Sequence, residues 1–403
     1  MRLPIPNILG NVLEHAPAFD PRGHTKNPRV VRALAGPVVR GLFLKQGKRG
    51  DETEMRHGAT TTFTWDYLRD QPELARLTQA ARRGQWDPDR DLDWSISVDP
   101  QDPDCELFDE DELPLAEIPG YRSLPVREQR AQRAALLSWM LSQFLHGEQG
   151  ALFAACQLTE AVSWVDGKLY GSTQVMDEGR HVEVFMRYLD SKLEKRYQIN
   201  DNLFVVLDAV INDERWDLKF LGMQILVEGL ALGAFGTMRA ATEEPLLREM
   251  LRRVITDEAR HVHFGVVALQ EIYKQLTPRE LREREDWAYE VCLMARNRFL
   301  AHEFFEEYYA HSMSMREWDR LSLGSRFMAR FRHTLFRRII PNLKRIGLLS
   351  ERMRPHYAQL GLLDLEHEKA APDLAVDELL GERRGPDPDA VMTGLEQELR
   401  RRA

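Results

Sequence analysis

The strings "MDEGRHVEVF" (Met176–Phe185) and "TDEARHVHFG" (Thr256–Gly265) both contain the pattern D-E-x-R-H, and the second copy follows the first by 80 residues. In a helix, a Glu and a His three positions apart lie on the same face. One such pair says little in a chain with 12 His. Glu54 and His57 form another pair, in a polar segment with no counterpart elsewhere. The fixed interval distinguishes the first two pairs.

The same interval relates a third position in each half of the chain. The six residues that it connects are Glu148, Glu178 and His181, then Glu228, Glu258 and His261. Each half therefore has a Glu and, 30 residues later, E-x-x-H. Two antiparallel helices joined by a short loop would bring the two Glu of each half to similar height. Glu160 competes with Glu148 as the first Glu, but its counterpart is Ala240.

Apolar residues at helical spacing surround both lone Glu residues, Glu148 and Glu228, which predicts that they face the core. A buried carboxylate without a partner is costly or becomes protonated. Four buried Glu with two His therefore require a source of positive charge, and two divalent cations would supply it. Oxygen ligands with imidazole suit iron or manganese, whereas a structural zinc site or an iron–sulfur cluster would use thiolates. The alternative is that these residues lie on solvated helix faces or pair with Arg180 and Arg260.

Composition restricts the class of protein. Of 403 residues, 43% are hydrophobic and 30% are charged, as in soluble globular proteins. The most apolar early stretch, "VVRALAGPVVRGLFL" (30–44), is interrupted by two Arg, so we expect no membrane span. The chain has three cysteines, Cys105, Cys156 and Cys292, which are too few and too scattered for a disulfide framework. Its N-terminus does not have the layout of a secretory signal, so we expect the protein in the reducing cytoplasm. A net charge of −9 argues against nucleic-acid binding.

The chain changes character after Leu124. Residues 1–124 are rich in Pro, Asp and Arg, with short helical pieces around 64–86, and predict an irregular N-terminal arm. Residues 125–346 predict a helical domain, and 347–403 a C-terminal extension whose tail is mobile from about 383. The expected helices lie near 126–165, 168–198, 214–241, 244–276, 279–312 and 316–343.

Taken together, these motifs resemble those of the ferritin-like di-iron carboxylate proteins. The D-E-x-R-H strings and the 30-residue intervals are most similar to hydroxylase subunits of bacterial multicomponent monooxygenases and to ribonucleotide reductase small subunits. The resemblance covers about 127–273 and extends less specifically to "QWDPDRDLDW" (85–94) and "FLHGEQGAL" (144–152). It implies an all-α fold, namely a ferritin-like four-helix bundle with additional C-terminal helices and an irregular N-terminal arm, in a homodimer.

The resemblance also implies roles for individual residues. One iron would be bound by Glu148, Glu178 and His181, and the other by Glu228, Glu258 and His261, with some Glu bridging. Asp177 and Asp257 would hold the imidazole nitrogens that do not bind metal. The alternative for these two Asp is a surface salt bridge with Arg180 or Arg260.

By the same resemblance, the site would activate dioxygen to oxidise an apolar, aromatic or acyl substrate, as a monooxygenase, N-oxygenase or desaturase does. Phe185 stands where reductase subunits carry a radical Tyr, Leu232 where many monooxygenases have Thr, and Val254 where N-oxygenases have a third His. A radical-generating or ligand-binding oxidase, with Fe/Fe or Mn/Fe, is the alternative enzyme. A non-catalytic metal-binding or storage bundle is the alternative outside enzymes.

Two further surfaces are predicted. The substrate pocket would be lined by residues one or two turns from a ligand: Phe153, Cys156, Phe185, Leu232 and Phe235. The alternative for each is ordinary core packing. Arg326, Arg330 and Arg337 fall at helical spacing in a basic segment and would dock an acidic electron donor such as a ferredoxin, or an acyl carrier protein. The alternative there is a solvated helix face.

Overall fold

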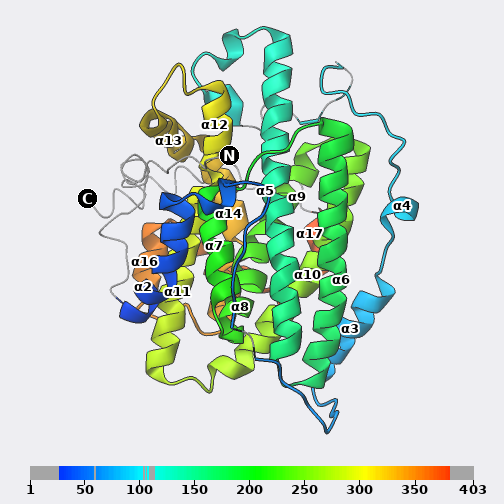
Figure 1. The fold of residues 1–403 in the computed structure, drawn as a ribbon, viewed down its shortest axis with the longest axis vertical. Coiled ribbons are helices and arrows are strands. Elements are labelled where there is room, and N and C mark those ends of the chain that lie inside the picture. Colours follow the sequence, from blue (N-terminus) through cyan, green and yellow to red (C-terminus); the bar gives the residue numbers. More distant parts are fainter. Residues whose placement is uncertain (1–26, 59, 103–104, 106, 109–113, 382–403) are drawn as a thin grey trace.

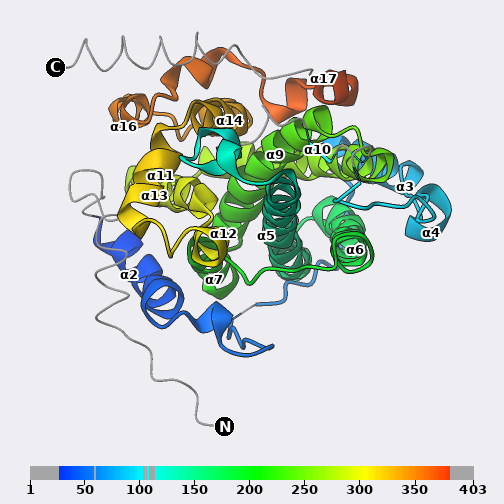
Figure 2. The same cartoon turned by 90° about the horizontal axis from the view of Figure 1, so that it is seen from above.

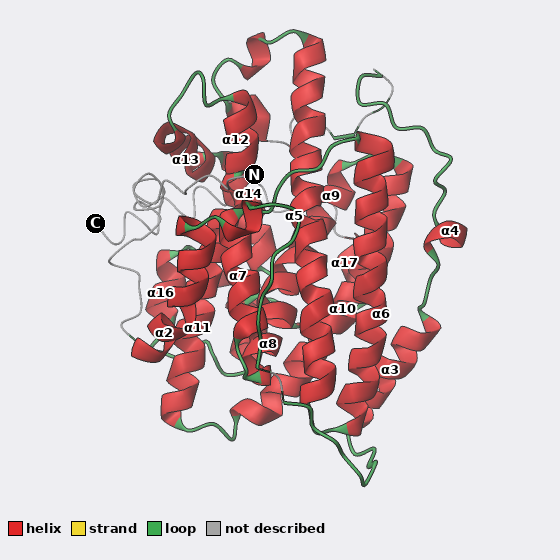
Figure 3. Ribbon diagram, viewed as in Figure 1, coloured by secondary structure: helices red, strands yellow, loops and turns green. Residues whose placement is uncertain are grey.

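The protein is described by a computed structural model in which residues 27–58, 60–102, 105, 107–108 and 114–381 can be placed. Within these ranges the chain forms helices and loops and contains no strand (Figure 3). The all-α prediction is therefore confirmed. The N-terminal 26 residues and the tail predicted to be mobile from about 383 lie outside the described residues.

The elements follow one another in a simple order. The N-terminal part contains α2 (Pro28–Val38), η2 (Val39–Phe43), η3 (Gln46–Lys48), α3 (Pro72–Arg83), α4 (Pro88–Asp91), η5 (Pro114–Glu117) and η6 (Tyr121–Ser123). The central part contains α5 (Val126–Ala161), α6 (Val165–Tyr188), η7 (Leu189–Leu193), α7 (Asp201–Asn212), α8 (Trp216–Phe220), η8 (Leu221–Val227), α9 (Glu228–Ala241), α10 (Pro245–Tyr273) and α11 (Pro278–Asn297). The C-terminal part contains η9 (Arg298–Leu300), α12 (His302–Tyr308), α13 (Met315–Gly324), α14 (Arg326–Phe336), α15 (Ile340–Arg345), α16 (Arg354–Gln359), η10 (Leu363–His367), η11 (Ala371–Asp373) and α17 (Val376–Gly381).

Long helices form the centre of the molecule. Helix α5 packs along α6, and α10 packs against α9 while also contacting α6 (Figures 1 and 2). Two of the junctions follow from local sequence. Pro245 occupies the first turn of α10, where its missing amide costs nothing, and the Glu244 carboxylate accepts from the amides of Leu246 and Leu247. Between α5 and α6, Trp164 turns inward and packs edge-on against Trp216.

The elements α8, η8 and α9 form one continuous helix, Trp216–Ala241, which is long and strongly apolar. Its length and composition alone would suffice for a membrane span, yet the whole apolar window is covered by other parts of the protein. A helix that is hydrophobic on all sides and covered on all sides is a core helix. Here it forms the wall against which α10, α11 and α14 pack.

A wide turn interrupts this helix immediately before Glu228. Residues Leu221–Val227 form a π-helix, and the amide of Glu228 donates to the carbonyl of Met223, five residues back. Each such turn shifts the angular position of every later residue, and π-turns concentrate at functional sites. The sequence predicted one regular helix over 214–241, so the π-turn is a feature that apolar periodicity did not show.

Besides shifts at helix ends, such as that of α6, which begins at Val165, the structure differs from the prediction in the following elements. Helix α7 (Asp201–Asn212) was not expected, because eleven of its twelve residues are buried and it has no polar face to give a periodic signal. The expected helix 279–312 breaks at Ala301, whose φ of 52° lies in the left-handed region. The expected helix 316–343 is divided into α13, α14 and α15.

Outer elements cover the central helices. Helix α3 lies on α6 and α10, α14 lies on α9, and α2 packs against α7. From the C-terminal extension, η11 and α17 contact α10. The described arm and extension therefore form part of the packed structure around α6, α9 and α10.

The contact between α9 and α14 gives a test of this packing. A Cβ at Gly233 would stand 2.7 Å from the Cα of Leu335, a backbone atom that cannot move cheaply. Gly236, one turn further along the same helix, has open space. We expect Gly233→Ala to destabilise the protein by about 1–3 kcal/mol through overpacking. Gly236→Ala should instead stabilise it by about 0.5–1 kcal/mol through helix propensity. Urea unfolding of both variants measures the difference, and equal effects would contradict the packing.

Candidate metal centre

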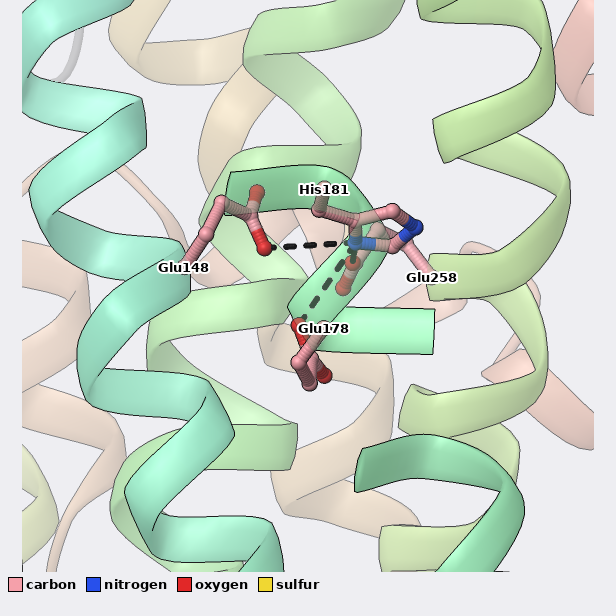
Figure 4. A group of neighbouring side chains, drawn as sticks. All are labelled: Glu148, Glu178, His181 and Glu258. Atoms are coloured by element: carbon pink, nitrogen blue, oxygen red, sulfur yellow. Dashed lines mark hydrogen bonds and ion pairs between the residues drawn. The ribbon is translucent and has the colours of Figure 1, made fainter. Parts of the chain in front are cut away.

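The six residues related by the 80-residue interval meet inside the protein. Glu148 comes from α5, Glu178 and His181 from α6, Glu228 from the start of α9, and Glu258 and His261 from α10. All six are buried, and the most exposed, Glu148, retains 5% of its accessible surface. Figure 4 shows four of them, with Glu148 and Glu258 reaching toward His181 from neighbouring helices. The expectation that both lone Glu face the core therefore agrees with the geometry.

His181 lies among three carboxylates. Its Nδ1 is 3.0 Å from Glu258 Oε1, 3.3 Å from Glu148 Oε2 and 3.5 Å from Glu178 Oε2. In this group each residue offers one ligand atom within 4.8 Å of all the others, so the group could hold a metal ion.

His261 forms the centre of a second group. Its Nδ1 is 3.1 Å from Glu178 Oε1 and 3.6 Å from Glu258 Oε1. The ligand atoms of Glu178, Glu228 and His261 lie within 4.8 Å of one another, and this group could also hold a metal ion. The resemblance assigned Glu258 to the second metal. In the structure Glu178 and Glu258 both lie between the two imidazoles, which is where bridging ligands would be.

The outer nitrogens of the imidazoles face two aspartates across the helix pair. His181 Nε2 is 3.2 Å from Asp257 Oδ2, and His261 Nε2 is 3.3 Å from Asp177 Oδ2. Each Asp thus serves the His of the other motif. A donor–acceptor pair at Nε2 fixes the tautomer and turns the Nδ1 lone pair toward the carboxylates.

Arginines and an N-terminal segment complete this outer ring. Arg180 contacts both Asp177 and Asp257, the latter at 3.1 Å, and Arg260 pairs with Asp257. The indole of Trp86 donates to Asp257 Oδ2 at 2.8 Å, and Gln85 donates to Asp177 Oδ1 at 2.8 Å. The aspartates therefore contact the imidazoles and also pair with Arg180 and Arg260, but these ion pairs are buried and are not the surface salt bridges of the alternative prediction.

Charge is balanced in the outer group, which consists of Asp177, Asp257, Arg180 and Arg260, but not in the inner group of candidate ligands. Two Asp and two Arg offset each other outside, whereas the inner group has four Glu and two imidazoles. Several buried inner atoms have no hydrogen-bond partner among the described residues: Glu178 Oε2, Glu228 Oε2, both oxygens of Glu258, and His261 Nδ1. When the proton of the imidazole is on Nε2, each of these atoms can only accept a hydrogen bond, and so can the ligand atoms around it. Protons or metal cations can satisfy them.

The ionisation of the metal-free site reflects this imbalance. Burial, followed by repulsion from Glu258, raises the pKa of Glu148 and of Glu228 well above the ordinary value. Burial alone would lower the pKa of His181, but its hydrogen bonds to Asp257 and the inner carboxylates raise it well above the usual range. The cluster of candidate ligands therefore takes up protons when it holds no metal.

Two glutamines of the site were not predicted. Gln174 Nε2 donates to Glu178 Oε1 and to Glu228 Oε1, both at 3.0 Å, and Gln224 donates to Gln174 Oε1 at 3.4 Å. Gln174 and Gln224 each precede a candidate ligand by four residues, which is one helical turn. For Gln224, a polar residue one turn from a Glu in an otherwise apolar segment was the signal that could have found it, whereas the many polar residues of α6 hide Gln174.

Competing ligand candidates lie elsewhere. Glu54 and His57 are exposed. Glu160 accepts from Thr61 at 3.3 Å, away from the cluster, and His263 pairs with Glu73 at 2.9 Å. Their rejection from sequence agrees with these positions.

The predicted substrate pocket needs a correction. Phe153 is 50% exposed and Cys156 is exposed, so neither lines a buried pocket beside the cluster. Both were chosen by distance along the helix, without regard to the outward face of α5. Phe185, Leu232 and Phe235 are buried, and the rings of Phe185 and Phe235 lie 5.6 Å apart.

The basic segment lies on α14 and the turn after it. Its apolar residues, among them Phe331 and Leu335, are buried as the helical spacing predicted. Arg326 is exposed, whereas Arg337 pairs with Glu368 at 2.9 Å. Docking of an acidic partner at Arg326, Arg330 and Arg337 stays a prediction.

Comparison of the chain with models of protein families, with curated proteins and with solved structures finds no match.

Metal binding should compete with protons at this site. Because the folded-state pKa values of Glu148, Glu228 and His181 are raised, their protonation stabilises the metal-free fold at low pH, and this contribution is lost as pH rises. A metal displaces these protons, so its affinity should increase between about pH 6 and pH 8. Calorimetry in buffers of different ionisation enthalpy measures the protons released. Binding without proton release, at an affinity independent of pH, would contradict this description of the cluster.

Trp86 should matter for metal affinity although it is not a ligand. Trp86→Phe removes the 2.8 Å hydrogen bond to Asp257 and loosens the support of His181. Loss of such a supporting hydrogen bond typically weakens metal binding about 10–100-fold. Trp94→Phe is a matched control, since the Trp94 indole donates to the carbonyl of Pro88, in its own segment. Equal metal affinity of the two variants would show that the outer ring does not orient the imidazole.

Proposed function

We propose that the protein is a dinuclear-iron enzyme that uses dioxygen to oxidise an apolar or amphiphilic organic substrate. The observation that carries the proposal is the convergence of four Glu and two His, with unsatisfied acceptor atoms, in the buried interior of the protein. Iron bound by such ligands supplies the redox chemistry by which dioxygen is activated. In this reading α5, α6, the α8–α9 helix and α10 are the four helices of a ferritin-like bundle.

The donor set fits iron. Carboxylate oxygens with imidazole suit iron and manganese. Of the cysteines, Cys105 and Cys156 lie outside both groups of candidate ligands, as does Cys292, which is buried. Four carboxylates match the charge of two divalent ions, and Glu178 and Glu258 lie where they could bridge them. A Mn/Fe pair would use the same ligands.

The chain itself contributes rigidity and dryness. The Asp–Arg ring holds both imidazoles in one tautomer, so the ligand atoms need no rearrangement when metal enters. The rings of Phe144, Phe185 and Phe235 pack together. The centroid of the Phe144 ring lies 4.6 Å from that of Phe235 and 6.1 Å from that of Phe185. This apolar wall keeps water from the cluster and presents a hydrocarbon surface to a substrate.

Anaerobic iron loading followed by exposure to oxygen tests the proposal. We expect about two iron ions per chain, oxygen uptake on exposure of the reduced protein, and oxidation of an added substrate in a single turnover. Glu258→Ala removes a carboxylate that lies between the two His, so it should abolish oxygen uptake and lower the iron content. Glu54→Ala, which alters an exposed pair of the same sequence pattern, should change neither.

Three results would redirect the assignment. Many iron ions per chain without substrate oxidation would indicate storage. A persistent tyrosyl signal in electron paramagnetic resonance would indicate a radical generator, with the buried Tyr170 as its first candidate. Equal oxygen uptake by Glu258→Ala and the unaltered protein would place the chemistry at another site.

A further inference from the structure

A separate cavity lies one helical turn from the candidate metal centre. It is lined by residues of the first half of α5, the start of α7, segment 114–118 and the region from η9 to α14. Its lining is mostly apolar and aromatic, including Trp139, Phe304 and Trp318. Phe144, four residues before Glu148, belongs both to this lining and to the three-phenylalanine wall beside the cluster. The cavity and the metal centre therefore share a side chain.

One cation lines this apolar space. Arg298 is 5% exposed, its buried Nε has no hydrogen-bond partner, and among the described residues no ion pair joins it to a carboxylate. The guanidinium carbon lies 4.7 Å from the centroid of the Phe299 ring. Burial without a compensating charge lowers the pKa of Arg298 to about 10, which still leaves it charged at neutral pH. An unpaired buried guanidinium is costly for the fold.

The other charged residue of the lining does not offset Arg298. Both oxygens of Glu117 accept backbone amides at the start of α14, from Arg326 and Phe327, each at 3.0 Å. The Glu117 side chain is exposed, whereas Arg298 is buried.

The backbone around Arg298 is also unusual. Helix α11 ends at Asn297, the 3-10 turn η9 follows, and Ala301 takes a left-handed conformation with φ 52° before α12 begins. The carbonyl of Leu300 accepts from the indole of Trp318 at 2.5 Å. A non-glycine residue in this region costs energy and is retained where surrounding structure requires it. Here the break places Arg298 and Ala301 on the same cavity.

We propose that this cavity binds an apolar molecule with a single carboxylate, in which the carboxylate pairs with Arg298 and the hydrocarbon extends along the aromatic lining toward Phe144. A planar guanidinium binds a carboxylate through two parallel hydrogen bonds, and the pair is strongest where water is excluded. The carboxylate of the ligand would supply the negative charge that is missing beside Arg298. This inference deepens the proposed function by naming its substrate class, and it rests on that function only in calling the ligand a substrate.

Binding of octanoate, octanol and octylammonium to the metal-free protein tests the inference by calorimetry, with tryptophan fluorescence reporting on Trp139 and Trp318 in the lining. We expect saturable binding of octanoate, at least tenfold tighter than that of octanol, and no binding of octylammonium. Equal binding of octanoate and octanol, tighter binding of octylammonium, or no saturable binding of octanoate would overturn the proposal.

Two arginine variants assign the charge. Arg298→Met should lower octanoate affinity at least tenfold, to the level of octanol, and leave octanol binding unchanged. Arg332→Met is the matched control, because Arg332 also has an unsatisfied buried nitrogen but is not part of the lining. Removing an unpaired buried charge should leave the melting temperature of Arg298→Met equal or higher. Equal loss of octanoate binding in both variants would overturn the proposal.

A further variant covers the case in which Arg298→Met does not fold. Arg298→Lys keeps the charge but not the two-pronged geometry, and it should bind octanoate more weakly than the unaltered protein yet more tightly than octanol. Octanoate affinity in this variant no better than that of octanol would count against the proposal. These binding measurements use protein without metal or oxygen, so their result does not depend on the proposed oxidation. If octanoate binds but the iron-loaded protein takes up no oxygen, only the proposed oxidation is refuted. Oxygen uptake without octanoate binding would refute the carboxylate site alone.

Discussion

The structure depends on one electrostatic constraint: four carboxylates and two imidazole lone pairs face each other in an interior that admits almost no water. Such an arrangement is unfavourable unless positive charge enters it. The surrounding architecture keeps it in place. Helices from both halves of the chain supply the ligands, and crossed His–Asp pairs connect one motif to the other. Arginines neutralise the aspartates outside, so the deficit of positive charge remains confined to the centre.

Much of this could be predicted from sequence because a repeated interval is a geometric statement. Residues related by a fixed offset along similar helices occupy equivalent positions, which is why six ligand candidates from four helical segments could be named together. Apolar periodicity was informative where a helix has one buried face, as in α10. It failed for α7, which is buried on nearly all sides, and for Ala301, because a single left-handed residue leaves no periodic trace.

The wrong predictions and the missed features depend on how the helices pack against one another. Phe153 and Cys156 were placed beside the metal centre because of their distance from Glu148 along α5, but they occupy its exposed face. The π-turn before Glu228 and the glutamine pair at Gln174 and Gln224 depend on how neighbouring helices meet. Arg298 looked like one more basic residue in the sequence. Only its burial without a partner distinguishes it from the many arginines that pair with acids.

The fold contains two neighbouring sites with opposite imbalances of charge. The inner cluster has carboxylates that lack cations, and the cavity beyond Phe144 has a cation that lacks an anion. Phe144 belongs both to the lining of the cavity and to the aromatic wall beside the cluster, so the two adjoin at this side chain.

The most direct test of the central claim is anomalous X-ray scattering at the iron edge from crystals of the protein loaded with iron. We expect two peaks inside the cluster, one beside His181 Nδ1 and one beside His261 Nδ1, with Glu178 and Glu258 between them. Anomalous density confined to surface carboxylates, with the six side chains remaining hydrogen-bonded to each other and free of metal, would contradict it.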